Sequence, residues 1–281
     1  MRKVRDRQEK RDQANGRLNA RNLFWSWYEP KNFGDWVTPY LFEKLTGSEA
    51  IHCKAQHLLP GATTLFGCGS VLRHIVTPDV AIVWGSGIID RADTFERPLR
   101  TLSVRGPRTR ARMLELGYDC PEAYGDPALM LPSVYLPKAG KTHELGVIPH
   151  FVDLPSIKQA SLPQGWKLID VTQNLEKVVD DIASCDRTVS SSLHGQIVSH
   201  AYGVPSAWVA ADAALHGDGV KFADYFESLG IMDAAPPPSW SDLRADNLSA
   251  FDFHHPDVAP LRDQLQNSCP FQSAAVLEVA R

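Results

Sequence analysis

Residues 188–209 read TVSSSLHGQIVSHAYGVPSAWV, and this pattern predicts a strand, a serine turn, a helix and a second strand. Apolar residues recur four positions apart at Leu193, Ile197 and Ala201, which is the spacing of a helix face that packs inward. We expect the helix to end near Gly203, because glycine adopts a positive φ without a steric cost. The β-prone residues on both sides of the helix then form strands of one sheet.

The serine turn predicts an anion site. A short strand-to-helix turn leaves the first backbone N–H groups of the helix without partners and directs them beyond the edge of the sheet. The hydroxyl groups of Ser190, Ser191 and Ser192 add donors, and Gly195 lies in the same helical turn. In the alternative interpretation, the serines only cap the helix.

His194 lies in the first turn of this helix and is the predicted proton-transfer residue. The positive end of a helix dipole disfavours a protonated imidazole. We therefore expect His194 to be neutral in an empty site and to take up a proton more readily once a phosphate or carboxylate binds. The alternative is a half-buried histidine with a purely structural role.

The chain has 281 residues, which predicts two domains. Apolar residues make up 43% of the chain and charged residues 22%, which is typical of a globular protein with a large core. No run approaches the roughly 20 apolar residues of a membrane-spanning helix. The first residues contain no apolar segment of a signal peptide, so the sequence predicts neither an anchor nor a secretory signal.

The five cysteines are scattered, odd in number and never arranged as C-x-x-C. This pattern predicts free thiols in a reducing compartment. The close histidine pair, His254 and His255, is adjacent in the chain, and neighbouring residues seldom serve one metal. We therefore predict no metal site and no cofactor.

The net charge of −4 is unevenly distributed. Residues 1–21 contain eight Lys or Arg and three Asp or Glu, which leaves 21 and 30 for the rest of the chain. An acidic body argues against nucleic-acid binding. For the basic leader at residues 1–21 we favour a disordered or frayed segment; a solvated helix or a peripheral contact with anionic lipid or a partner are the alternatives.

Strand-like and helix-like segments alternate along the whole chain. The predicted strands cover residues 22–28, 63–66, 80–84, 99–104, 145–148, 167–171, 188–189 and 206–209, and the predicted helices cover residues 36–45, 108–116, 175–182, 193 to about 203, 221–229 and 258–265. The organisation comprises a leader at 1–21, an N-terminal α/β lobe at 22–137, a C-terminal α/β lobe at 138–235, and a proline-rich break with a helical tail at 236–281.

This alternation predicts parallel sheets, and its occurrence in both halves predicts two Rossmann-like lobes that face a central cleft. Ligands of such sheets bind beyond the carboxyl ends of the strands. The candidate residues, and the glycine-flanked turn at residues 67–70, follow predicted strands, so we expect one cleft to collect them.

Asn32, Gly34 and Asp35 follow the first predicted strand. We expect Asp35 to cap the next helix and Gly34 to let the backbone approach a ligand closely. A capped helix after a tight turn is the alternative explanation.

Further along the first half, Gly85, Ser86 and Gly87 form a glycine-flanked turn, which is typical of phosphate-binding loops but also of close packing between a helix and a sheet. Arg105 follows a strand and can clamp a carboxylate or phosphate, because its planar guanidinium binds two oxygens at once. Asp126 lies in a Gly-Asp-Pro segment after a turn.

Five ordered segments between residues 22 and 210 resemble the polysaccharide pyruvyl transferase family. They are NFGD at 32–35, GSG at 85–87, SVR at 103–105, GDPA at 125–128 and SSSLHG at 190–195. No single segment is decisive, but their order makes the set fairly specific.

The resemblance implies a fold like that of two-lobed, GT-B-like glycosyltransferases and the transfer of pyruvate from phosphoenolpyruvate onto a sugar as a ketal. It implies donor binding and catalysis by Arg105 and His194. Many family members have Asp where this chain has Gly106, and Arg where it has Ser192. A donor-binding cation is therefore missing or comes from elsewhere, with Arg73 and Lys31 as candidates.

The expected reaction assigns a role to each candidate. Arg105 holds the donor carboxylate, the serine turn holds the phosphate, His194 transfers a proton, and Asp35 or Asp126 orients the acceptor hydroxyl groups. The expected partners are phosphoenolpyruvate and a glycan or lipid-linked oligosaccharide, and this role implies a location in the cytoplasm, at the inner face of the membrane.

Two other functions remain open. A glycosyltransferase of the same form would use a nucleotide sugar and needs a site for base and ribose, for which residues 210–218 offer no clear carboxylate. A non-catalytic glycan-binding module is the second alternative, and Gly106 and Ser192 are the arguments for it.

Overall fold

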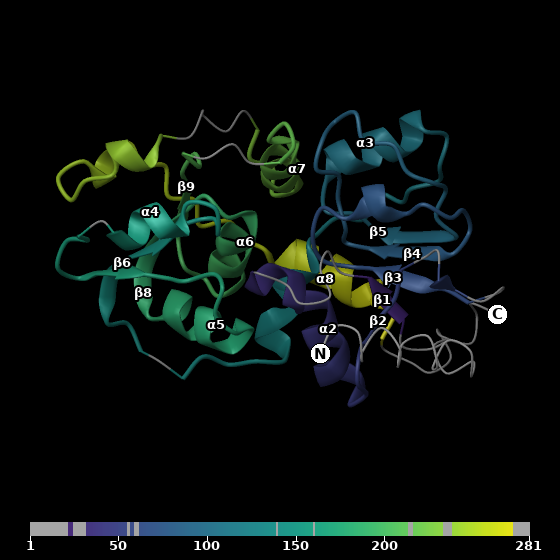
Figure 1. Ribbon diagram of the computed structural model, residues 1–281, viewed down its shortest axis with the longest axis horizontal. Coiled ribbons are helices and arrows are strands. Elements are labelled where there is room, and N and C mark those ends of the chain that lie inside the picture. The colour runs from purple at the N-terminus through teal and green to yellow at the C-terminus, as the bar shows by residue number, and fades with distance from the viewer. Residues whose placement is uncertain are drawn as a thin grey trace.

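The computed structural model describes residues 22–24, 32–54, 57–58, 62–138, 140–159, 161–212, 216–232 and 238–271. Within these residues the chain forms two parallel β-sheets, which lie apart along the long axis of the molecule (Figure 1). The predicted α/β class with parallel sheets is confirmed. The basic leader at residues 1–21, the second part of the strand predicted at 22–28, and Lys31 lie outside the described residues.

The first sheet has the strand order β2-β1-β3-β4-β5, and all neighbours pair in parallel. Its strands are β1 (Asn22–Phe24), β2 (Ile51–His52), β3 (Thr64–Phe66), β4 (Ala81–Trp84) and β5 (Arg100–Ser103). The last three match the predicted strands to within one residue at each end. The sequence did not predict β2, because two residues are too few to show a period.

The helices of this half are α2 (Val37–Thr46) and α3 (Pro107–Glu115), and the 3-10 helix η1 (Phe33–Trp36) leads into α2. Pro107 occupies the first turn of α3, where its missing N–H has no partner to lose. The predicted cap at Asp35 was wrong. Asn32 caps η1 instead, since its Oδ1 accepts a hydrogen bond of 2.9 Å from the Gly34 N–H, and Asp35 lies inside η1.

The second sheet has the order β7-β6-β8-β9, again parallel throughout. Its elements are β6 (His143–Ile148), α4 (Leu154–Gln159), β7 (Trp166–Leu168), α5 (Leu175–Ala183), β8 (Cys185–Ser190), α6 (Leu193–Ala201) and β9 (Ser206–Trp208). The predicted strand, turn, helix and strand over residues 188–209 are confirmed. Leu193, Ile197 and Ala201 are all buried, as the helix period requires.

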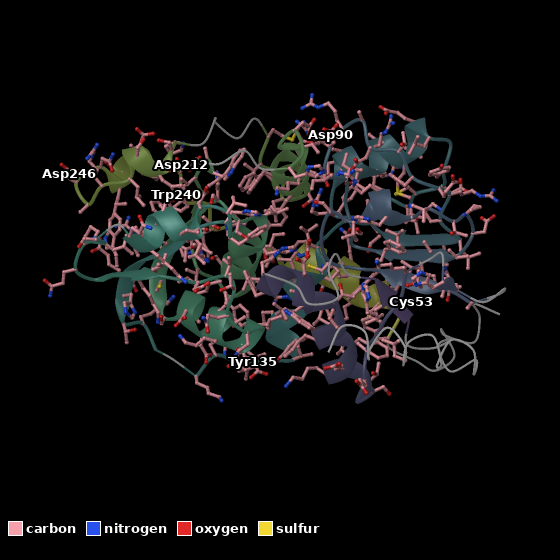
Figure 2. The ribbon with its side chains drawn as sticks, in the orientation of Figure 1. Cys53, Asp90, Tyr135, Asp212, Trp240 and Asp246 are labelled. Atoms are coloured by element: carbon pink, nitrogen blue, oxygen red, sulfur yellow. The ribbon has the colours of Figure 1, made fainter. Side chains whose placement is uncertain are left out.

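Two further helices join the halves. α7 (Val220–Ser228) follows β9 and lies beside α3 of the first half, and α8 (Ala259–Asn267) lies between the two sheets (Figure 1). The Trp84 Nε1 donates to the Leu265 carbonyl at 3.2 Å, and Arg262 donates to the Ala201 carbonyl at 3.0 Å. A single apolar cluster contains core residues of both halves. Figure 2 shows side chains filling the space between the elements.

Among the described residues, no helix is both long enough and apolar enough to span a membrane.

Candidate active site

A pocket lies at the carboxyl ends of strands from both sheets. Segments that follow β1, β3 and β4 contribute Asn32, Asp35, Ser70 and Ile89, and segments that follow β6, β7 and β8 contribute a second group. That second group includes His150, Val171, Ser192 and His194, and Lys221 of α7 completes the polar lining. This is the general position of ligand sites in open α/β sheets.

The first loop connects the two halves beside this pocket. The Phe33 N–H donates to the Val171 carbonyl at 2.9 Å, so the segment after β1 is anchored to the segment after β7. The Asn32 Nδ2 also donates to the Asp35 Oδ2 at 2.7 Å. The Asp35 carboxylate is therefore held at the pocket by the residue that caps its own turn.

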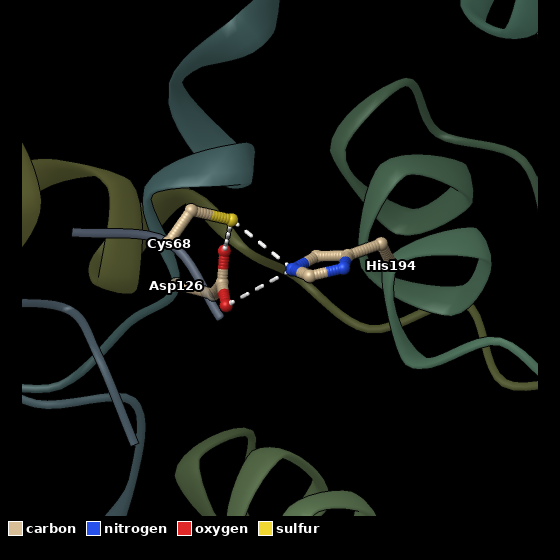
Figure 3. Close-up of side chains that lie close together, drawn as sticks. All are labelled: Cys68, Asp126 and His194. Carbon is tan, nitrogen blue, oxygen red and sulfur yellow. Dashed lines mark hydrogen bonds and ion pairs between the residues drawn. The ribbon is translucent and has the colours of Figure 1, made fainter. Parts of the chain in front are cut away.

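His194 reaches across the pocket from α6 to two side chains of the first half. Its Nε2 lies 3.1 Å from the Cys68 Sγ and 3.8 Å from the Asp126 Oδ2 (Figure 3). Asp126 caps the 3-10 helix η4 (Pro127–Ser133), because its Oδ1 accepts from the Ala128 N–H at 3.0 Å. Both Cys68 and Asp126 are buried, whereas the His194 side chain is 14% exposed.

The contacts of Cys68 determine where the histidine carries its hydrogen. Burial, and then the charge of Asp126, raise the pKa of the Cys68 thiol well above its usual range, so it stays protonated. The thiol donates to the Asp126 Oδ1 at 3.0 Å, and the contact between Sγ and the His194 Nε2 then requires a hydrogen on Nε2. In this neutral tautomer, Nδ1 carries no hydrogen.

Gly34 leaves the space that the His194 ring fills. A Cβ on residue 34 would overlap the Nδ1 and Cγ atoms of the ring and would lie 2.8 Å from its Cε1. Gly34 has no positive φ, so its requirement is the close approach of the ring and not its backbone conformation. The sequence predicted that Gly34 lets the backbone approach a ligand closely. In the structure, the group that approaches Gly34 is the imidazole of His194.

Lys221 and His150 set the charge of the pocket. Burial, and then the charge of Arg105, lower the pKa of Lys221 to about 8, against the opposing effect of Asp35. Burial and the charge of Lys221 lower the pKa of His150 to about 4, so His150 is neutral near pH 7. Lys221 therefore supplies a positive charge to the pocket below pH 8.

Cys68, Asp126 and His194 also offer one sulfur, one oxygen and one nitrogen within 4.8 Å of one another. These ligand types suit Zn²⁺, and the Asp126 Oδ2 has no hydrogen-bond partner among the described residues. The same three side chains are also bonded to one another, through the hydrogen bond from Cys68 to Asp126 and the contact between Cys68 and His194. The absence of a metal site stays a prediction of the sequence.

A family profile matches most of the chain. The sequence profile of the family described as polysaccharide pyruvyl transferase matches residues 17–212. The chain belongs to the polysaccharide pyruvyl transferase family.

Two relatives show how far the similarity extends. The succinoglycan biosynthesis protein ExoV of Rhizobium meliloti (strain 1021) is 29% identical over 224 residues, which cover 71% of this chain and 62% of that protein. The uncharacterized protein L143 of Acanthamoeba polyphaga mimivirus is 28% identical over 232 residues, which cover 79% of each chain. The chain thus matches less than two thirds of the length of ExoV.

Arg105, the arginine of the segment that resembles the family, does not line the pocket. It is fully buried, its Nε donates to the Asp224 Oδ2 at 3.0 Å, and its two terminal nitrogens donate to the Ser70 Oγ at 2.6 Å and the Ile88 carbonyl at 2.7 Å. The predicted position of Arg105 at the cleft surface was therefore wrong. The strand end carries the residue, but the side chain turns toward α7.

The serine turn divides its residues between structure and pocket. Ser190 donates to the Ile148 and Ser192 carbonyls, and Ser191 donates to the Asp153 Oδ2 at 3.2 Å, so both hydroxyl groups have partners inside the protein. Gly195 packs tightly, because a Cβ there would lie 2.9 Å from Ile148. Among the turn residues it is Ser192 that lines the pocket, together with His194.

The turn at Gly85, Ser86 and Gly87 packs closely against neighbouring segments of the first half. A Cβ at Gly85 would lie 2.7 Å from the Gly125 carbonyl oxygen, and one at Gly87 would lie 2.7 Å from a terminal nitrogen of Arg105. Ser86 is buried and donates to the Gly69 carbonyl at 2.9 Å. These three residues do not line the pocket, and their close packing corresponds to the alternative explanation of the glycine pattern.

Cys68 and Ser70 belong to the glycine-flanked turn at residues 67–70, which the sequence predicted at the cleft without assigning a role to either side chain. Two polar residues of the site, His150 and Lys221, were not predicted. His150 follows a strand, so position alone could have indicated it. Lys221 carries no such signal, because it lies at the start of a helix among other polar residues. Of the cations suggested as substitutes, Arg73 contacts His216 and does not line the pocket.

Proposed function

We propose that this chain transfers pyruvate from phosphoenolpyruvate to a sugar of an exopolysaccharide or cell-surface glycan precursor, and releases phosphate. The observation that carries the proposal is His194, which lies in the pocket with the Asp126 carboxylate 3.8 Å behind its Nε2. A histidine between a pocket and a buried carboxylate is suited to proton transfer. Membership of the family supports the reaction class.

In the proposed reaction, the imidazolium of His194 gives its Nδ1 proton to the methylene carbon of the donor. The central carbon of the donor becomes cationic, and one sugar hydroxyl adds to it and loses its proton. A second hydroxyl then displaces phosphate from the same carbon and closes the ketal. One of the two hydroxyl protons restores the imidazolium and the other leaves with phosphate.

The buried carboxylate of Asp126 stabilises the imidazolium that this reaction needs. Asp35 lines the same pocket and is held by Asn32, so we propose it as the group that orients the acceptor hydroxyl. Of the serine turn, Ser192 lines the pocket. The two α/β halves would correspond to the lobes of a GT-B-like enzyme, divided near residue 138.

The test is phosphate release from phosphoenolpyruvate in the presence of sugar acceptors, with mass spectrometry of the product for added pyruvate. We expect His194→Ala to lower the rate by about 10² to 10⁴. His255→Ala is the matched control, because His255 is exposed and lies outside the pocket, and it should retain the full rate. Full phosphate release by His194→Ala would refute the proposal, and release of a nucleotide from a nucleotide sugar would favour the glycosyltransferase.

The acceptor and the location are part of the same proposal. Succinoglycan biosynthesis is the printed role of the relative ExoV, which supports an acceptor in exopolysaccharide assembly. We propose a lipid-linked precursor as the acceptor and, with it, a position at the cytoplasmic face of the membrane. Sedimentation with vesicles of anionic lipid, for the full chain and for a chain that lacks residues 1–21, tests this position.

A further inference from the structure

Cys68, Asp126 and His194 bring three kinds of metal-binding atom together. Among the described residues, only this group of histidine, cysteine or acidic side chains places three ligand atoms within 4.8 Å of one another. Cys68 follows β3, Asp126 caps η4, and His194 lies in the first turn of α6 (Figure 3). The group is assembled by the fold from three distant segments, and it joins the first half of the molecule to the second.

The separations of the ligand atoms suit a tetrahedral ion such as Zn²⁺. Zinc binds sulfur at about 2.3 Å and nitrogen or oxygen at about 2.0 to 2.2 Å, so two ligand atoms of one ion lie about 3.3 to 3.6 Å apart. The His194 Nε2 lies 3.1 Å from the Cys68 Sγ and 3.8 Å from the Asp126 Oδ2. Changes of about 0.5 Å or less in these two separations would give the zinc geometry.

The Asp126 Oδ2 is the atom that points to a ligand. Asp126 is fully buried, and its Oδ1 accepts from the Cys68 thiol and from the Ala128 N–H at 3.0 Å each. Its Oδ2 has no hydrogen-bond partner within the described part of the chain, and it faces His194 (Figure 3). A buried carboxylate oxygen without a partner is unfavourable, and a metal ion on Oδ2 would remove this cost.

The charges of the group also balance those of a divalent ion. When Zn²⁺ binds, the Cys68 thiol loses its proton to the solvent and becomes a thiolate. The thiolate and the Asp126 carboxylate together carry two negative charges, so the loaded site is neutral. In the free protein the carboxylate has only the His194 imidazole at ion-pair distance, and the imidazole compensates the charge only when it is protonated.

The three ligands are held in place before an ion arrives. The Cys68 N–H donates to the Thr38 Oγ1 at 2.7 Å, and the Ala128 N–H fixes the Asp126 carboxylate. The missing Cβ of Gly34 leaves the space in which the His194 ring lies. Contacts of this kind orient the ligands of metal sites and raise their affinity.

His194 connects the group to the pocket. Its side chain is 14% exposed and lines the pocket, whereas Cys68 and Asp126 are buried behind it. An ion can therefore enter from the pocket, and a fourth ligand, a water molecule or an oxygen of a bound substrate, would come from the same side. Three protein ligands with an exchangeable fourth ligand are typical of zinc sites that exchange with the solution or take part in chemistry.

We propose that Cys68, Asp126 and His194 form a Zn²⁺-binding site, and that the bound ion reversibly inhibits the enzyme. A metal on Nε2 takes the place of a hydrogen, so the imidazolium of His194 cannot form, and the charge of Asp126 is neutralised. The ion is taken up from solution and is not a resident cofactor, so the reaction proposed above needs no metal. The inhibition rests on the proposed function, but the binding does not.

The first experiment measures Zn²⁺ binding to the full chain by competition with a chromophoric chelator. We expect Cys68→Ser and His194→Ala each to weaken binding by at least about 100-fold, because the loss of an outer contact alone costs about 10-fold to 100-fold. Cys120→Ser and His255→Ala are the matched controls, since both residues lie outside the group, and they should keep the wild-type affinity. Equal affinity of Cys68→Ser and the wild type would overturn the inference.

Co²⁺ reports the ligands directly, because it accepts the same nitrogen and sulfur ligands and its absorption spectrum depends on them. We expect a thiolate-to-metal band and the intense visible bands of tetrahedral Co²⁺ in the wild type, and no thiolate band in Cys68→Ser. If Cys68→Ser does not fold, Asp126→Asn takes its place and should keep the thiolate band while it weakens binding. A wild-type spectrum of octahedral Co²⁺ without the thiolate band would overturn the site.

Thermal unfolding gives a third readout. Because the ligands come from both halves of the molecule, Zn²⁺ should raise the Tm of the wild type, as any ligand of the folded state does. The same concentration of Zn²⁺ should leave the Tm of Cys68→Ser nearly unchanged. An equal shift of the Tm in both proteins would mean that the ion binds elsewhere and would contradict the site.

The inhibition is tested by phosphate release from phosphoenolpyruvate with increasing Zn²⁺, followed by a chelator. We expect the rate to fall and the chelator to restore it, with at least about 100-fold more Zn²⁺ needed for Cys68→Ser. Because Zn²⁺ also binds free phosphate compounds, Cys68→Ser under the same conditions is the control for loss of substrate. A rate that disappears with the chelator and returns with Zn²⁺ would overturn the inhibitory role.

These outcomes are distinguishable from a failure of the proposed function. Zn²⁺ binding that depends on Cys68 and His194, without any pyruvate transfer, would support the site and refute the reaction. Pyruvate transfer that is unaffected by saturating Zn²⁺ would support the reaction and refute the inhibition.

Discussion

If the proposed function holds, Gly34→Ala should greatly slow pyruvate transfer, because the new Cβ displaces the His194 ring while His194 itself is unchanged. The new Cβ would overlap Nδ1 and Cγ of His194 and lie 2.8 Å from Cε1, whereas carbon atoms in contact are about 3.5 to 4.0 Å apart. The ring must therefore move by about 1 Å or more, which disturbs its contacts with Cys68 and Asp126. A misplacement of 1 Å can cost about 100-fold in rate, or about 2.7 kcal/mol of transition-state stabilisation.

The assay is the steady-state release of phosphate, combined with thermal and urea unfolding. Gly140→Ala is the matched control, because a Cβ there meets nothing within 4 Å, and it should keep the wild-type rate. Overpacking of this kind costs about 1 to 3 kcal/mol of unfolding free energy. This cost should largely disappear in a His194→Ala background, where the ring is gone.

Two results would refute this reasoning. The first is a rate within threefold of the wild type for folded Gly34→Ala, which would mean that the position of the ring does not matter. The second is an equal loss of stability in the presence and absence of the His194 ring, which would place the clash elsewhere.

Three further predictions concern the groups around this histidine and around Arg105. Asp126→Asn should lower kcat with little change in the affinity for phosphoenolpyruvate, because it removes the charge that stabilises the imidazolium; an unchanged kcat would contradict this role. Chelators should leave phosphate release unchanged, while added Zn²⁺ should inhibit by occupying the ligand atoms of Cys68 and His194, and Cys68→Ser should weaken that inhibition; a chelator-sensitive rate would instead indicate a resident metal. Asp224→Ala should lower the unfolding free energy by about 3 to 5 kcal/mol in urea titrations, because it leaves the fully buried Arg105 without its partner, and a loss below 1 kcal/mol would show that the pair is not essential to the docking of α7.

The order of the elements could be predicted because it depends on local pattern. The apolar face of α6 at Leu193, Ile197 and Ala201 and the short apolar run of β4 are properties of neighbouring residues, and both were predicted. The strand β2 and the helix α4 were missed because they are short and acquire their structure from contacts with the rest of the chain. The cap of the first helix was misassigned because a 3-10 turn precedes it.

The sequence by itself determined the alternation of strands and helices, and with it the class of fold and the placement of His194 at the start of a helix beyond a strand end. Only the tertiary structure decided which charges reach the pocket. The bonds concerned join residues far apart in the chain: Cys68 and Asp126 differ by 58 in residue number, and Arg105 and Asp224 by 119. Local periodicity reports which face of an element is apolar, but the burial of a charge depends on what the folded chain packs against it, and this is why Arg105 is enclosed while Lys221 faces the pocket.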